Sequence, residues 1–305
     1  MGFLKKNFSG KNKEDKVQYF SGWEVCLDDS DQCENFLSTQ CVDRQTALSS
    51  SSFIQLNFNE NNLLKSGKLF SDRKEVTEGH LLDNLQLKTA IDNLKFRDIA
   101  VNKVYNFNED NNGLHQFGGD FPADFKIPSN NLRVPFQYLG YLDNKDETFN
   151  WLPFRLNLIC PIYLNIGNVF LDYSEPLNPT IINREEVEKA NCSYDELNSE
   201  TKIIFKEVKF KTEFSNEIEY GIGHTGIPNW IQYPAIPRCP KTNKTMKFVC
   251  QLRSDVGVEV KESNVVPSSD FMASYFKEMN FWGDGDLFIF FEPTSKVACY
   301  FIQNT

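Results

Sequence analysis

The sequence GGDFPADFKIP at 118–128, followed by VPFQYL at 134–139, has a counterpart further along the chain. The counterpart reads GIPNWIQYP at 226–234 and continues as MKFVCQL at 246–252. In each stretch two prolines stand six residues apart, and an apolar run typical of a strand comes next. Two copies of one module predict two halves related by a pseudo-twofold axis rather than a solenoid.

The composition is typical of a folded protein dominated by sheet. The chain has 305 residues, of which 40% are hydrophobic and 27 are phenylalanines. Aromatic residues favour strands, and the apolar content is too high for an intrinsically disordered chain. We therefore expect an α+β fold dominated by antiparallel sheet, internally duplicated about a pseudo-twofold axis, with few short helices.

Three parts follow one another along the chain. Residues 1–16 are rich in Lys, Asn, Ser and Gly, and predict a flexible N-terminal arm. Residues 17–109 form a region without a clear identity, which we expect to pack on the core. Residues 110–305 form the duplicated domain, with halves of about 110–200 and 201–305.

Local patterns place individual strands and helices. Alternation of apolar and polar residues predicts strands, and Asn or Ser before a periodic segment predicts a helix start. The Gly-Asp-Gly turn before a phenylalanine-rich run predicts the start of a hairpin. The apolar residues between Leu81 and Val104 show both helical and alternating spacings, so the secondary structure of that segment is left unassigned. The predicted strands are 50–58, 203–214, 287–291 and 296–303, and the predicted helices are one that begins after Asn183 and one at 269–279 with Ser269 or Ser268 as its N-cap.

The net charge of −10 limits the classes of partner. A protein that binds nucleic acid is expected to carry a basic surface, and an acidic chain is repelled by anionic membranes. Acidity favours a basic protein partner, although it also serves solubility. No apolar run approaches the roughly 20 residues that span a bilayer. The basic start MGFLKKNF at 1–8 has no apolar segment behind it, so we expect a cytoplasmic protein without a secretory signal.

The eight cysteines are scattered without the spacing of a disulfide framework, which predicts free thiols. Cys26, Cys33 and Cys41 are too far apart in sequence for a zinc knuckle, whose cysteine pairs are typically two to four residues apart. We expect neither a metal nor another cofactor.

Two histidines are candidates for a binding or acid–base site. His115 and His224 fall near equivalent points of the two repeats. If the halves face each other, the two imidazoles could converge with Asp120 or Asp124 and form an acid–base or metal site. The alternative is that each histidine makes a hydrogen bond within its own loop.

Two further pairs of residues are candidates for recognition. Trp230 and Gln232 follow a Gly-x-Pro turn, where a tryptophan either binds a partner or caps a core. Asp284 and Asp286 form an acidic pair that suggests a cation site, but the full calcium-loop pattern is missing, which favours a polar hairpin turn instead.

The second half resembles the YwqG-like family of bacterial proteins. HQFGGDFP at 115–122 resembles the Gly-Gly-x-x-Pro element of the family's first half, so the likeness covers about residues 110–305. Family members often carry Cys-Pro-x-Cys-Gly, whereas this chain reads CPKTNK at 239–244 and keeps only Cys239. The family pattern of Gly-x-Pro-x-Trp-x-Gln, Cys-Pro, Met-x-Phe-x-x-Gln-Leu and a Gly-Asp-x-Gly turn appears here in that order at 226–232, 239–240, 246–252 and 283–287.

The resemblance implies a mixed α+β fold built on an internal duplication, with no established shared catalytic activity. Several family members are encoded beside polymorphic toxins, which implies an antitoxin-like binding role. We therefore expect a non-enzymatic cytoplasmic binding protein, an immunity protein that neutralises a basic toxin domain encoded nearby by binding it through an acidic surface. The alternatives are a small-molecule or peptide-binding protein, or a hydrolase, that uses a cleft between the repeats, and a structural module without a ligand.

Overall fold

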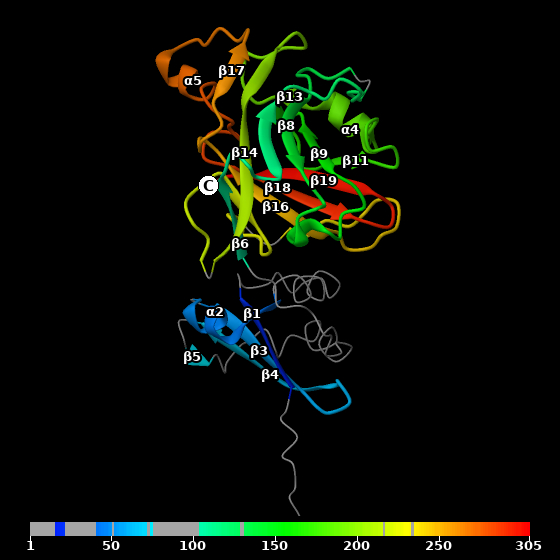
Figure 1. Cartoon of the computed structure of the whole chain (residues 1–305), viewed down its shortest axis with the longest axis vertical. Coiled ribbons are helices and arrows are strands. Elements are labelled where there is room, and N and C mark those ends of the chain that lie inside the picture. The colour runs from blue at the N-terminus through cyan, green and yellow to red at the C-terminus, as the bar shows by residue number, and fades with distance from the viewer. Residues whose placement is uncertain are drawn as a thin grey trace, which may run out of the picture. The chain divides into compact units, whose positions relative to one another are not determined.

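The computed structural model describes residues 16–21, 41–50, 52–71, 74–75, 104–128, 131–215, 217–232 and 235–305. The chain divides into two compact units, Met1–Val101 and Asn102–Thr305 (Figure 1). Of the described residues, 44% lie in strands and 9% in helices, so the predicted sheet-dominated class with few short helices is confirmed. The N-terminal arm up to residue 15, Cys26, Cys33 and the unassigned segment up to 103 lie outside the described residues.

Unit 1 contains an antiparallel sheet with strand order β2-β1-β3-β4-β5. The sequence prediction of a strand at 50–58 is confirmed by β3, in which Phe53 pairs and stacks with Phe70 of the next strand at 4.5 Å. Asp43 caps the helix, since its Oδ1 accepts the Thr46 N–H at 2.8 Å. The elements are β1 (Lys16–Ser21), β2 (Cys41–Val42), α2 (Arg44–Ser49), β3 (Ser52–Phe58), β4 (Leu64–Ser71) and β5 (Lys74–Glu75).

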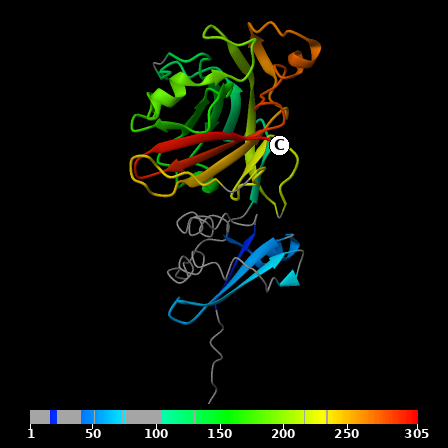
Figure 2. The ribbon, with the colours of Figure 1, turned by 180° about the vertical axis from the view of Figure 1, so that it is seen from behind.

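Unit 2 is built on one large antiparallel sheet that curls into a half-barrel, as Figure 1 and Figure 2 show from opposite sides. The strand order is β12-β11-β19-β18-β16-β15-β6-β14-β7-β8-β9, and β17 also pairs with β14. The strands are β6 (Val104–Glu109), β7 (His115–Gly119), β8 (Gln137–Leu142), β9 (Leu156–Cys160), β11 (Val169–Asp172), β12 (Thr180–Ile181), β14 (Ile203–Ser215), β15 (Gly223–Thr225), β16 (Lys247–Arg253), β17 (Val260–Ser263), β18 (Asp286–Glu292) and β19 (Val297–Gln303).

The remaining elements of unit 2 are short. A separate two-stranded sheet joins β10 (Leu164–Asn165) to β13 (Asn191–Cys192). The helical elements are η1 (Glu147–Phe149), α4 (Arg184–Lys189) and α5 (Asp270–Ser274). No helix among the described ranges is long and apolar enough to cross a membrane.

The predicted strands of unit 2 are confirmed, whereas the helix predictions are only partly right. The strands predicted at 203–214, 287–291 and 296–303 correspond to β14, β18 and β19. Helix α4 begins where predicted, but the Asn183 side chain makes no cap hydrogen bond. It accepts the Phe170 N–H at 2.9 Å instead and so ties the helix start to β11.

Helix α5 is capped by Ser269 as predicted, since the Ser269 hydroxyl accepts the Met272 N–H at 3.2 Å. It ends at Ser274 rather than 279, however. Beyond its end the chain makes backbone hydrogen bonds with the segment 258–260: the Val260 N–H donates to Lys277 O at 2.7 Å, and the Met279 N–H donates to Val258 O at 2.8 Å. Backbone groups used in this way cannot continue the helix.

Strands β6 and β14 pair at the centre of the large sheet. Their antiparallel register runs from Glu109↔Phe210 to Val104↔Ser215. The other edge of β6 pairs with β15, and the other edge of β14 pairs with β7. The division between the units thus falls at 101/102, before β6, whereas the sequence prediction placed the boundary at 109/110.

Buried tyrosines connect the two ends of the half-barrel. The Tyr173 hydroxyl, just beyond β11, donates to the backbone oxygen of Asn157 in β9 at 2.7 Å. It also lies 3.1 Å from the hydroxyl of Tyr300 in β19, while Tyr138 of β8 donates to Asn157 Oδ1 at 3.0 Å. Because β9 ends the strand order on one side and β11 lies near the other end, these hydrogen bonds hold the curl of the sheet.

We expect Gly140→Ala to destabilise unit 2 and Gly167→Ala to be tolerated. Gly140 has φ +119°, and an added Cβ would lie 2.0 Å from Gln116 O. Strain of this backbone type costs about 1–3 kcal/mol, and the clash adds to it. At Gly167 an added Cβ meets nothing within 4 Å, so alanine is expected to be neutral or to stabilise by up to about 1 kcal/mol. Urea unfolding followed by tryptophan fluorescence compares the two variants, and equal unfolding midpoints would contradict this account of β8.

Candidate binding site

His115 is a buried, neutral histidine with both ring nitrogens engaged. The Asp143 N–H donates to Nδ1 at 3.1 Å, so the ring proton resides on Nε2, which lies 3.1 Å from Asp146 Oδ2. Burial lowers the pKa of His115, and the neighbouring Asp146 opposes this shift only in part. Asp146 is itself held by the Thr148 N–H at 2.8 Å and the Thr212 hydroxyl at 2.9 Å. No nitrogen of His115 is left to exchange a proton with a substrate.

His224 is also fully buried. It lies 2.9 Å from Ile227 O through Nε2, and Nδ1 has no partner among the described residues. Burial, with a smaller contribution from the charge of Arg253, lowers the pKa of His224 to about 3. The ring contacts Phe248 at 6.4 Å between centroids. His224 thus fastens the Gly-Ile-Pro turn to the apolar side of β16.

The structure does not bring the two histidines together. Strands β15 and β7, which carry them, are separated by β6 and β14 in the sheet. Three strand spacings of about 4.8 Å each put them roughly 14 Å apart. Asp120 is exposed and pairs with Lys261 at 2.9 Å, and Asp124 is exposed as well. The proposed convergence with Asp120 or Asp124 therefore has no counterpart in the described structure.

Trp230 lies in the core rather than on the surface. It is 4% exposed and stacks on the rings of Phe288, Phe290 and Phe301, at centroid distances of 5.1, 6.1 and 6.4 Å. Gln232 is exposed, and its side-chain amide donates to Asn304 O at 2.9 Å. Both residues attach the loop after β15 to β18, β19 and the C-terminal segment.

Gln251 holds the Gly-x-Pro-x-Trp loop, although it was not among the residues predicted from the sequence. Its position in the Met-x-Phe-x-x-Gln-Leu pattern was the signal that could have identified it. Its Oε1 accepts the Asn229 N–H at 2.7 Å, and its Nε2 donates to Asn229 O at 2.9 Å. The same Nε2 donates to Asp286 Oδ2 at 2.5 Å. One buried amide thus holds the backbone of the Gly-x-Pro-x-Trp loop against two strands.

Of the two carboxylates in the hairpin turn, Asp286 is buried and Asp284 is exposed. Asp286 is 8% exposed, and burial raises its pKa, opposed in part by the hydrogen bond from Gln251. Asp284 is exposed and accepts a hydrogen bond from the Thr305 hydroxyl. The two carboxylates thus differ in surroundings, and no group of three or more His, Cys, Asp or Glu side chains in the described ranges is arranged to hold a metal ion.

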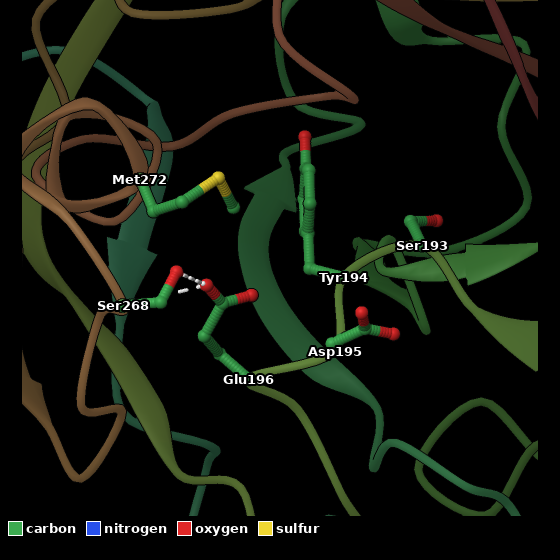
Figure 3. Close-up of a pocket in the computed structure, with 6 residues that line it drawn as sticks. All are labelled: Ser193, Tyr194, Asp195, Glu196, Ser268 and Met272. Atoms are coloured by element: carbon green, nitrogen blue, oxygen red, sulfur yellow. Dashed lines mark hydrogen bonds between the residues drawn. The ribbon is translucent and has the colours of Figure 1, made fainter.

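A pocket of about 520 Å³ lies in unit 2. Ser193–Glu196 line it, together with Ser268 and Met272 (Figure 3). We call it the acidic pocket. In Figure 3 the Met272 thioether extends toward the Tyr194 ring, and the Glu196 carboxylate lies below them beside Ser268. The segment Ser193–Glu196 is held in place because the Ser193 N–H donates to Tyr163 O at 2.8 Å.

Aromatic rings surround Tyr194 on the inner side of the acidic pocket. Tyr194 stacks on Tyr275 at 5.5 Å and meets Phe276 edge-on at 5.7 Å. Fully buried Tyr163 lies 6.3 Å from Tyr194 and carries a hydroxyl without a partner among the described residues. The aromatic packing fixes the position of the Tyr194 ring at the wall.

Carboxylates dominate the electrostatics of the acidic pocket. Burial, the Tyr275 hydroxyl and the charges of Asp255, Asp284 and Glu196 together raise the pKa of Tyr194 to about 12. Ser268 donates to Glu196 Oε1 from both its hydroxyl and its N–H, and this lowers the pKa of Glu196. None of the described lining residues is Lys or Arg.

Comparisons with known proteins add no assignment, since no protein-family model, no curated protein and no solved structure matches the chain. The YwqG-like assignment therefore stays a prediction.

We expect His224→Gln to flatten the dependence of stability on pH between pH 6.5 and 5. The folded-state pKa of His224 lies below the unfolded-state value, so the unfolded chain binds a proton that the folded chain does not. The contribution of His224 is fully present above pH 6.5 and decreases as the pH falls, by about 1 kcal/mol per pH unit. Urea unfolding at a series of pH values gives the slope, and identical slopes for both proteins would contradict a buried neutral imidazole.

We expect Gln251→Leu to lower the free energy of unfolding by about 3 kcal/mol or more. The change leaves the buried Asp286 carboxylate without its donor, which costs about 1–3 kcal/mol, and removes both hydrogen bonds to the backbone of exposed Asn229, worth about 0.5–1.5 kcal/mol each. Gln232→Leu, in the same loop but exposed, is the matched control and should change stability by less than about 1 kcal/mol. Calorimetric or urea unfolding that ranks the two variants equally would remove Gln251 as the residue that holds the loop.

Proposed function

We propose that the chain is a non-enzymatic, cytoplasmic binding protein that captures a basic protein partner, in the manner of an immunity protein that neutralises a toxin. The observation that carries the proposal is the group of carboxylates around the acidic pocket, on a chain with a net charge of −10. Complementary charge steers a basic partner to such a surface and orients it there.

The contacts of His115 and His224 do not favour acid–base catalysis by either ring. A histidine that acts as a general base needs a ring nitrogen that can reach the proton it abstracts. Both nitrogens of His115 have protein partners, and His224 is enclosed in the core with its pKa lowered to about 3. Neither ring is placed to exchange protons with a ligand.

We also propose that unit 2 is internally duplicated. The strand order supports this, because it reads β6-β15-β16-β18 in one direction from the centre and β14-β7-β8-β9 in the other. Both arms carry a bulge at the same step: the register of β8 against β9 shifts between Tyr138 and Gly140, and that of β16 against β18 shifts between Phe248 and Cys250. A YwqG-like ancestry would account for both features.

The pairing register refines the correspondence between the repeats. Tyr141 of β8 pairs with Gln116, and Gln251 of β16 pairs with His224. If the two bulges are equivalent, His224 corresponds to Gln116, and His115 corresponds to the glycine at 223. The proposed duplication therefore gives the histidines different positions, in keeping with their different contacts.

A second candidate function is the binding of a small molecule or a peptide at the acidic pocket. The observation that favours it is the volume of about 520 Å³, since ligand sites typically measure about 300–1,000 Å³. None of the described lining residues is a histidine or a cysteine, so the lining contains no Ser–His or Cys–His pair for nucleophilic catalysis.

The first proposal is tested by co-expression with the product of the adjacent gene, followed by co-purification. We expect the two proteins to associate at micromolar concentration, and the association to weaken as salt rises from about 0.05 to 0.5 M, because salt screens exposed charges. An unrelated protein of similar positive charge serves as the control. Failure of the gene product to associate, or equal retention of the control, would overturn the proposal.

A further inference from the structure

The carboxylates of the acidic pocket differ from those on the neighbouring sheet. Acidic side chains on and beside β17 are neutralised within the protein: Lys202, just before β14, pairs with Glu262 of β17 at 2.8 Å, and Lys206 of β14 pairs with Glu259, just before β17. Asp195 and Glu196 of the pocket form no ion pair with any described residue, and the same holds for Asp255 and Asp284. The carboxylates at the pocket are therefore not joined in ion pairs to cations of the described chain.

One carboxylate is held in a position suited to a ligand. Both hydrogen bonds that Ser268 donates to Glu196 go to Oε1, and no other residue of the described chain donates a hydrogen bond to Oε2. Asp195, the adjacent lining residue, is exposed. A carboxylate fixed through one oxygen presents the other to a donor without losing further side-chain freedom, which reduces the cost of ordering on binding.

Apolar and aromatic surface lies beside these charges. Tyr194 and Met272 face each other across the pocket (Figure 3). Val266 and Phe271, on either side of Ser268, are 83% and 69% exposed. An aromatic ring attracts a cation in addition to the carboxylates, and apolar neighbours accommodate the aliphatic part of a long basic side chain.

From this combination we propose that the acidic pocket binds an organic cation, a guanidinium or alkylammonium group, and that the source of the cation is a basic side chain of the protein partner. Glu196 Oε2 accepts from the cation, and Asp195 supplies further negative charge at the opening. Tyr194 and Met272 contact the methylene stem. The exposed Val266 and Phe271 favour a protein source over a free amine, since they offer apolar surface outside the pocket that a small amine does not cover.

The choice of partner rests on the proposed function, whereas the binding of the cation does not. The first test therefore uses a probe without the partner: titration of the full chain with N-acetyl-arginine amide, followed by backbone NMR signals at residues 193–196 at low salt. The neutral isostere N-acetyl-citrulline amide is the matched control ligand. We expect saturable shifts with the arginine probe and at least a tenfold weaker response to the citrulline probe.

The protein variant for this test is Asp195→Asn combined with Glu196→Gln, which keeps an acceptor for Ser268. We expect it to lose at least tenfold in affinity for the arginine probe. Glu262→Gln removes one carboxylate that is already paired with Lys202, and it should bind as the unmodified chain does. Equal binding of the arginine and citrulline probes, or unchanged binding by the double variant, would overturn the inference.

The second test repeats the co-purification with the double variant and separates the two proposals. Reduced capture of the partner by the double variant, with Glu262→Gln unchanged, supports a basic side chain of the partner as the occupant. If the chain binds the arginine probe but does not associate with the partner, the cation site is retained and its ligand is a free amine. That result would overturn both the proposed function and the proposal that the partner supplies the cation. If the double variant still associates with the partner as the unmodified chain does, the acidic pocket does not bind the partner, and the proposed function is retained.

Discussion

The antiparallel pairing of β6 with β14 is the contact on which the rest of unit 2 depends. It joins segments far apart in sequence, with Glu109 opposite Phe210 and Val104 opposite Ser215. On its other edge, each of these strands pairs with the strand that comes next in the chain after its partner. Thus β6 pairs with β15, which follows β14, and β14 pairs with β7, which follows β6. These pairings cover both edges of β6 and both edges of β14, which would otherwise present unpaired backbone groups.

This exchange of strands explains which parts of the fold the sequence could predict. Strands such as β18 and β19 follow from short continuous apolar runs and from the Gly-Asp-Gly turn before β18, because both signals lie within a few residues. The pairing of β6 across the sheet has no local signal. The apolar residues between Leu81 and Val104 mix helical and alternating spacings. The strands that pair with β6, which are β14 and β15, lie about a hundred residues later in the chain. Periodicity predicts that a strand exists, but not which strand will lie beside it.

The candidate site shows the same division between local and long-range information. The glycine, proline and tryptophan of 226–232 were recognisable as a turn, yet their role depends on Gln251, His224 and the phenylalanines of β18. His115 and His224 looked equivalent by their distance from glycine, but the register matches His224 with Gln116 if the bulges correspond. A shift of one residue along a strand places a side chain on the opposite face, so counting along the sequence cannot establish equivalence. The acidic pocket was not predicted, because residues 193–196 and 268–272 carry no common motif.

The unpaired carboxylates of the acidic pocket affect stability and binding in opposite directions. In the free protein, Asp255, Asp284 and Glu196 all act on the Tyr194 hydroxyl, and burial, with a smaller contribution from the charge of Glu278, raises the pKa of Asp255. Repulsion among like charges opposes folding, although solvent and salt reduce its size because Glu196 and Asp284 lie near water. A bound cation would reverse the sign of this contribution by turning each carboxylate into an attractive neighbour. A surface that needed only solubility could disperse its acidic residues, or pair them with lysines as β14 and β17 do. We therefore attribute the concentration of unpaired charge beside Tyr194 and Met272 to the proposed cation site rather than to solubility alone.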